Sequence, residues 1–165
     1  MRKWIGPTLL IVIPTTLLAW VAVPNVIAAR NGAKQSQTMA DIRSIAAAWE
    51  ARATDVNSYD VDHGYSAAKK GDDYLVLHHV RYADLERALV PTYIKKLPRQ
   101  DGWGDDYDFA TGDYDTSGAA RVYSLRSLGG DGRAQPGPYV SKGITDFNDD
   151  LVFTNGEFLQ YVEGT

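Results

Sequence analysis

The chain of 165 residues contains no cysteine. Without cysteine there is no disulfide framework, no thiol nucleophile and no cysteine-based metal knuckle. The sequence also lacks a serine nucleophile elbow, a phosphate-binding glycine loop and a zinc motif. The adjacent His78 and His79 do not suggest a shared metal site, because neighbouring residues of a strand point to opposite faces. Since these routes to catalysis are missing, we expect a protein that is not an enzyme.

Acidic residues are missing from the first part of the chain. Residues 1–34 hold four of the seventeen basic residues and no acid. The remainder therefore has thirteen basic against twenty-one acidic residues, so a basic end precedes an acidic body. We expect no nucleic-acid partner, because phosphate binding needs clustered lysine and arginine. This division of charge suits an anchored envelope protein.

A long uncharged segment runs from Trp4 to Ala29. About 20 apolar residues are enough for a helix to cross a bilayer, and proline inside such a helix is tolerated. We therefore predict that residues 1–29 form the membrane-embedded half of an N-terminal helix and that residues 30–165 form an extracytoplasmic domain. A cleaved signal peptide is the alternative, since Val26-Ile27-Ala28 has the small residues of a cleavage site. The apolar run is longer than such peptides usually have.

The helix is expected to continue beyond the apolar run. Apolar residues recur at spacings of three and four, which is the pattern of one buried stripe on an amphipathic helix. The stripe consists of Met39, Ile42, Ile45, Ala46, Trp49 and Ala53. One helix is therefore predicted from about Ile5 to about Ala53, with its second half packed on a domain.

The rest of the chain predicts a second short helix and several strands. Asn155-Gly156 between two alternating apolar runs indicates a two-residue hairpin, because both turn residues need positive φ. The expected elements are a helix over 82–89 and strands near 74–77, 107–109, 121–125, 151–154 and 157–161. The fold class is thus α+β, with a long helix packed on a small antiparallel sheet. Aromatic residues of the strand regions are expected in the core: Trp103, Tyr107, Phe109 and Tyr123.

Four segments resemble the type IV pilins and the type II secretion pseudopilins, most closely the G-type major pseudopilin. They are Pro24–Asn31 with Ala33–Ser36 at the membrane exit, Leu97-Pro98 with Asp101-Gly102-Trp103-Gly104, Tyr123-Ser124-Leu125 with Ser127–Gly132, and Thr145–Asp150. The resemblance implies a pilin-like fold and a structural subunit of a type II secretion pseudopilus or a related filament. It also implies a single pass through the inner membrane, with the C-terminal domain in the periplasm or outside the cell. The implied partners are copies of the chain or other pseudopilins, met through the N-terminal helix, and the secretion-system assembly platform.

The N-terminus departs from that family's processing site. Gly6 stands where the family has the glycine before the cleaved bond, but Pro7 follows it and Ile11 occupies the position of the family's glutamate. Alignment on Pro24 instead places Arg2 at the glycine and Pro7 at the glutamate. In the family this carboxylate helps a new subunit to dock in the filament. Its loss suggests an uncleaved relative or a minor subunit.

The resemblance also implies a calcium ion held by Leu128, Asp131, Asp149 and Asp150, which would close the loop 128–150. Calcium takes six to eight oxygen ligands from carboxylates and carbonyls, and this loop is rich in both. The alternative is that these aspartates are solvated loop residues. Asp146, Asn148 and Asp150 also match the start of an EF-hand loop, but Leu151 replaces its essential glycine, so we reject that motif.

Two other functions are open on the sequence alone. One is a membrane-anchored or secreted domain that binds a ligand or partner without polymerising. The other is an envelope hydrolase that uses paired carboxylates, for which the candidates are Asp101, Asp105, Asp106 and Asp108.

Overall fold

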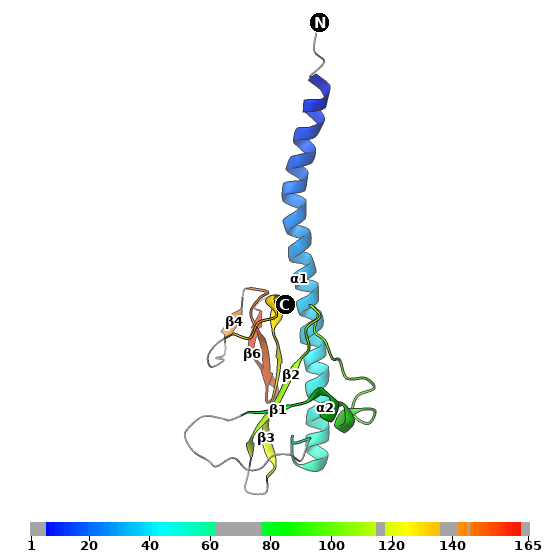
Figure 1. Ribbon diagram of the computed structural model, residues 1–165, viewed down its shortest axis with the longest axis vertical. Helices are drawn as coiled ribbons and strands as arrows, with labels where there is room; N and C mark the ends of the chain where they lie inside the picture. The colour runs from blue at the N-terminus through cyan, green and yellow to red at the C-terminus, as the bar shows by residue number, and fades with distance from the viewer. Residues whose placement is uncertain (1–5, 62–76, 115–117, 136–141, 145, 163–165) are drawn as a thin grey trace.

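The computed structural model describes the backbone of residues 6–61, 77–114, 118–135, 142–144 and 146–162. Within these ranges, the side chains of residues 6–24, 113–114, 142–144 and 160–162 are not described. Helix α1 spans Gly6–Val56, a length of 51 residues. Its N-terminal part projects beyond the rest of the molecule, and its C-terminal part lies against the sheet (Figure 1). The prediction of one continuous helix is therefore confirmed.

The apolar stripe of α1 forms the helical side of the core. All six predicted positions are at most 9% exposed. Trp49 lies at the centre, with its ring 5.3 Å from that of Tyr123 and 6.4 Å from that of Phe109. Its indole N–H donates a hydrogen bond to the carbonyl of Tyr59 at 2.9 Å, so the buried polar atom is satisfied. The periodic pattern thus predicted the packing face of α1 correctly.

The described strands form one sheet in the order β1-β2-β3-β5-β6-β4. Their bounds are β1 His78–Val80, β2 Asp108–Tyr114, β3 Ala120–Ser127, β4 Lys142–Ile144, β5 Leu151–Thr154 and β6 Glu157–Val162. All neighbours are antiparallel except β4 and β6, which are parallel. Five of the six strands thus form the expected antiparallel sheet packed against α1, and β4 adds a parallel strand at its edge.

The short helix and the hairpin occur where the sequence places them. Helix α2 spans Tyr82–Leu89, and its Leu85 and Leu89 are fully buried. At the hairpin turn, Asn155 has φ 46° and Gly156 has φ 92°, as the Asn-Gly signal requires. Of the strand expected at 74–77, residues 74–76 lie outside the described residues, and β1 begins just after them at His78.

Candidate functional site

Three segments that are far apart in the sequence meet beside α1. They are the loop 101–105, the end of β3 with the short 3-10 helix η1 (Gly129–Asp131), and the segment 146–150 that precedes β5. The N–H of Gly130 donates to the carbonyl of Phe147 at 2.7 Å. A Cβ atom on Gly129 would lie 2.5 Å from the carbonyl oxygen of Asp149, so only glycine allows this approach. The two ends of the predicted calcium loop therefore lie in direct contact.

The loop 101–105 is organised by the buried carboxylate of Asp101, which is 6% exposed. Its Oδ1 accepts hydrogen bonds from the N–H groups of Trp103, Gly104 and Asp105 at 2.9, 2.9 and 3.1 Å. Its Oδ2 accepts the hydroxyl of Ser127 at 2.5 Å. Asp101 thus ties the loop to the end of β3, and its four hydrogen bonds are those of a turn-forming residue.

The same loop rests on α1 through a glycine. The N–H of Gly102 donates to the Thr38 hydroxyl at 2.9 Å, and that hydroxyl donates to the carbonyl of Lys34 at 2.9 Å. A Cβ on Gly102 would lie 2.3 Å from the Lys34 oxygen. Loop 101–105 is therefore held between α1 and the η1 turn, and it fixes the position of the turn relative to the helix.

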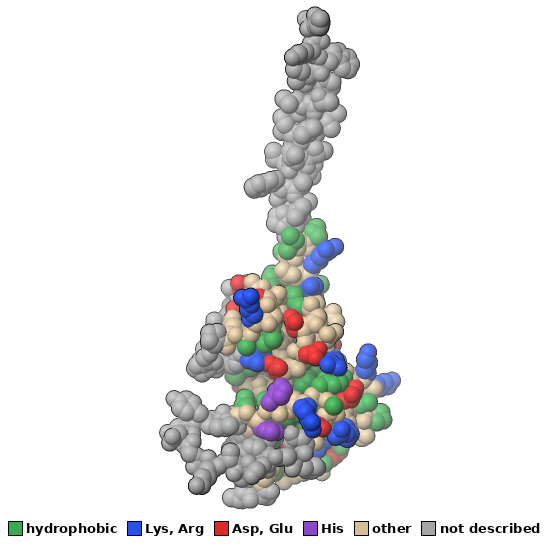
Figure 2. Space-filling model, in the orientation of Figure 1, with side chains coloured by type: hydrophobic (Ala, Val, Ile, Leu, Met, Phe, Trp, Pro, Cys, Tyr) green, Lys and Arg blue, Asp and Glu red, His purple; other side chains and the backbone are tan. Residues whose placement is uncertain are grey.

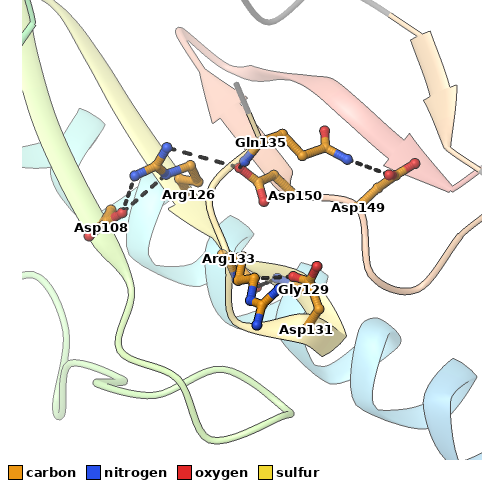
Figure 3. A network of polar contacts seen from close by, with 9 residues as sticks. Asp108, Arg126, Gly129, Asp131, Arg133, Gln135, Asp149 and Asp150 are labelled. Atoms are coloured by element: carbon orange, nitrogen blue, oxygen red, sulfur yellow. Dashed lines mark hydrogen bonds and ion pairs between the residues drawn. The ribbon is translucent and has the colours of Figure 1, made fainter. Parts of the chain in front are cut away.

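A chain of polar contacts crosses the sheet and reaches the two acidic residues before β5 (Figure 3). The Arg126 guanidinium binds the Asp108 carboxylate, with N–O distances of 3.0 and 2.5 Å. It also lies 3.9 Å from Oδ2 of Asp150, whose side chain is fully buried. The buried carboxylate thus has a positive charge nearby, which offsets part of the cost of removing it from water.

Gln135 contacts both acidic residues before β5. Its backbone N–H donates to Oδ2 of Asp150 at 3.1 Å, and its side-chain amide donates to Oδ1 of Asp149. In Figure 3 the side chain of Gln135 extends along the acidic pair. Sequence reasoning did not identify Gln135 or Arg126, because neither residue belongs to the motifs on which the resemblance rests.

The four predicted calcium ligands are placed as follows. Leu128 and Asp131 flank and end η1, and the Asp131 carboxylate accepts the N–H of Arg133 at 2.9 Å. Asp149 and Asp150 face Gln135. Among the described residues, no three histidine or acidic side chains come together as metal ligands. Calcium at this loop would therefore need peptide carbonyls as well as carboxylates, which is the mixture that this ion takes.

The aspartates considered for hydrolysis make hydrogen bonds, ion pairs or packing contacts with other parts of the fold. Asp106 pairs with Arg99 at 3.1 Å and Asp108 pairs with Arg126. Asp105 lies next to the left-handed turn at Gly132. The exposed His79 and the half-buried His78 account for the histidines visible in Figure 2. This arrangement does not favour the hydrolase alternative.

Two shallow clefts, of about 440 and 230 Å³, flank Glu50 of α1. Neither cleft is lined by any of the four aspartates considered for hydrolysis, which are Asp101, Asp105, Asp106 and Asp108. The hydroxyl of the buried Tyr123 donates a hydrogen bond to the Glu50 carboxylate. Burial first and this hydrogen bond second raise the pKa of Tyr123 well above its ordinary value. The pair connects α1 to the middle of the sheet.

The predicted membrane anchor falls on residues 1–29, and side chains are described only from residue 25 onward. Gly6 and Pro7 begin α1, and their side chains are among those not described. Within the described part of the chain, no helix is both long enough and apolar enough to span a membrane.

Comparison with known proteins gives one finding. The chain is similar to type II secretion system core protein G of Pseudomonas aeruginosa, with 29% identity over 126 residues. The aligned region covers 76% of this chain and 80% of that protein. No family model and no solved structure matches the chain. The similarity is to the same class of protein that the sequence motifs resemble, and it suggests a structural role at the level of the family.

Proposed function

We propose that this chain is a structural subunit of a type II secretion pseudopilus or of a related pilin-like filament. The observation that carries the proposal is the arrangement of α1, whose C-terminal part packs into the body while its N-terminal part projects beyond it (Figure 1). The projecting part contains most of the uncharged segment, and its backbone extends away from the sheet in that view. Similarity to a secretion-system protein over most of both chains supports the same role.

In this proposal the projecting part of α1 anchors the chain in the inner membrane and contacts other subunits. The body, residues 30–165, then lies in the periplasm or outside the cell. The partners are copies of this chain or other pseudopilins, together with the assembly platform of the secretion system. Pro7 and Ile11 depart from the resembled family's processing site, so the proposal includes a chain that is not cleaved between Gly6 and Pro7. Mass spectrometry of the membrane-extracted chain tests this: an intact Met1 supports it, and a mature chain that starts at Pro7 contradicts it.

The absence of cysteine makes a direct test of assembly possible. Two cysteines introduced in the projecting part of α1, at Leu10 and Leu18, would be the only thiols in the chain. If subunits pack through this region, oxidation in membranes gives a ladder of crosslinked products. The control variant carries one cysteine at the exposed Gln100 and should remain mostly monomeric. Monomers alone from the helix variant would contradict assembly through α1.

A non-polymerising, anchored or secreted binding domain is the second candidate. Ile11 favours it, because the carboxylate that helps subunits to dock in the resembled family is missing at this position. The crosslinking experiment separates the two candidates. Electron microscopy of material sheared from the cell surface adds an independent readout, since only the first candidate predicts filaments.

We further propose that the loop 128–150 binds one calcium ion through Leu128, Asp131, Asp149 and Asp150. The donor atoms fit calcium in kind, because they are carboxylate and peptide oxygens. The hydrogen bond from the N–H of Gly130 to the carbonyl of Phe147 joins the two ends of the loop. Bound calcium would supply positive charge to the acidic pair and stiffen the loop. A chelator should lower the thermal midpoint of the full chain, and an unchanged midpoint would contradict calcium binding.

A further inference from the structure

One segment of the acidic body is basic. Residues 81–100, which comprise α2 and the loop after it, hold five basic and two acidic residues and so carry a net charge of +3. Residues 35–165 together hold thirteen basic and twenty-one acidic residues, a net charge of −8. Lysine and arginine side chains gather over the region of α2 on the face that Figure 2 shows. This basic segment is therefore a local exception on a body whose net charge makes copies repel each other.

The cations of the basic segment are open to a partner. Arg81 and Arg87 share the buried carboxylate of Asp84, at 2.6 and 3.0 Å, and 76% and 77% of their side chains remain exposed. Lys95 and Lys96 are exposed, and among the described residues no carboxylate forms an ion pair with either of them. One buried carboxylate thus holds two arginines in place, while two lysines remain available for contacts with another molecule.

The opposite charge gathers where α1 leaves the body. Six acidic residues and one basic residue, a net charge of −5, lie in the three segments of this acidic end, which are 101–105, 129–135 and 146–150. Even with one calcium ion bound, its formal charge would stay negative at −3. The acidic end is thus complementary to the basic segment in sign and similar to it in size.

One subunit cannot bring these two surfaces together. Gly102 of the acidic end lies against the backbone of Lys34, whereas Tyr93 of the basic segment donates a hydrogen bond to Asp55 at 2.8 Å. Lys34 and Asp55 are 21 residues apart in α1, which at about 1.5 Å per residue separates them by about 30 Å. In Figure 1, α2 accordingly lies beside the C-terminal half of α1. The two complementary surfaces can therefore meet only between different molecules.

Subunits that pack through their projecting helices all point in one direction. An offset along that direction brings the acidic end of one body beside the basic segment of another, in a head-to-tail contact that can repeat along a filament. We propose that the basic segment binds a second copy of this chain, through the acidic end of the neighbouring subunit. This inference rests on the proposed filament role and names a contact between bodies that the packing of α1 does not supply.

Crosslinking of the bodies tests this contact, because the chain has no cysteine of its own. One cysteine replaces the exposed Thr92 and another replaces the exposed Ala134, and membranes are treated with a bis-maleimide whose spacer is far shorter than the separation of the two ends. A crosslink between the two positions then joins different subunits. We expect a ladder of products from the chain with both cysteines. The controls, Thr92→Cys alone and Ala134→Cys alone, should give no product beyond a dimer, because one thiol per chain cannot extend a series.

Charge reversal tests the force that forms the contact. Lys95→Glu with Lys96→Glu, or Asp105→Lys with Asp146→Lys, should each lower the crosslinked fraction of the two-cysteine chain at least about fivefold, because attraction becomes repulsion. The chain with all four substitutions keeps its net charge and exchanges the signs of the two surfaces, so it should regain most of the crosslinked fraction. Thermal midpoints identify any variant that fails to fold, and the exposed lysine pair keeps the test valid if the aspartate variant is unstable.

The outcomes separate this inference from the filament role. A ladder from cysteines at Leu10 and Leu18 without one from Thr92 and Ala134 would overturn the contact between bodies and leave assembly through α1 in place. Equal crosslinking in the charge-reversed variants would also overturn the inference, since the contact would not depend on these charges. Products in which mass spectrometry finds a different protein in place of the second copy would show another partner and contradict it. Absence of both ladders would count against the filament role as well.

Discussion

The close approach of η1 to the segment before β5 can be tested by a single methyl group at Gly129. Its backbone has φ 66°, and a left-handed conformation costs a residue with a side chain about 1–2 kcal/mol. The added Cβ of Gly129→Ala would also lie 2.5 Å from the carbonyl oxygen of Asp149 and 3.0 Å from the backbone of Asn148. Since both neighbours are backbone atoms, no change of rotamer relieves the overlap.

Gly132 provides a matched control for the cost of placing a side chain on a left-handed backbone conformation. Its φ is 63°, nearly the same as that of Gly129, but the atoms nearest to an added Cβ belong to the side-chain carboxylate of Asp105, the closest at 3.1 Å. A side chain can move by a few tenths of an ångström, so Gly132→Ala should cost about 1–2 kcal/mol. Gly129→Ala should cost about 2 kcal/mol more, because the two segments must separate and the Gly130–Phe147 hydrogen bond weakens.

Urea denaturation of the full chain in detergent measures both variants. Tryptophan fluorescence is a suitable signal, since Trp49 is in the core and Trp103 packs next to Gly130. The midpoint of Gly129→Ala should fall clearly below that of Gly132→Ala, with an unchanged slope. Equal destabilisation of the two variants would show that the close contact between η1 and Asp149 is absent in solution, and the reasoning about the loop would then be wrong.

Three further predictions concern the loop, the pH dependence and the core. Asp101→Ala should lower the free energy of unfolding by about 3 kcal/mol, because three N–H groups and the Ser127 hydroxyl lose their buried acceptor; Asp101→Asn should cost less, and equal losses would contradict this account. The native state holds the proton of Tyr123 more tightly than the unfolded state does, so its contribution to stability is complete below about pH 10 and declines above it, by at most about 1.4 kcal/mol per pH unit. Urea midpoints between pH 8 and 11 should therefore fall less steeply for Tyr123→Phe than for the unchanged chain. Trp49→Ala should cost about 3–5 kcal/mol in the same assay, and a loss below about 1 kcal/mol would mean that α1 does not pack on the sheet as described.

Rules that relate neighbouring residues to local structure were sufficient to predict several elements of the fold. The spacing of apolar residues in α1 identified its buried face, since a helix of 3.6 residues per turn brings those positions to one side. Helix α2 was predicted with its observed bounds. The Asn155-Gly156 turn was predicted because few residue pairs tolerate positive φ twice in succession. Each of these signals depends on residues that are close together in the sequence.

Other features depend on contacts between distant residues, and no local pattern encodes them. Tyr123 and Glu50 are 73 residues apart, and Ser127 and Asp101 are 26 apart. The parallel edge strand β4 follows from the path that the chain takes around the hairpin. The calcium ligands and the processing residues Gly6 and Pro7 stay predictions.

The sequence by itself determined the long helix, its buried stripe, the hairpin and the likeness to a pilin-type subunit, because periodicity and turn chemistry are local properties. Only the tertiary structure decided that η1 lies against the segment before β5, and that Arg126 and Gln135 reach the carboxylates of Asp149 and Asp150. Hydrogen bonds of this kind require donor and acceptor atoms to be brought within about 3 Å of each other, and the ion pair between Arg126 and Asp150 spans 3.9 Å. Strand register and close packing of backbone at glycine set those distances, and both arise only when the whole domain has folded.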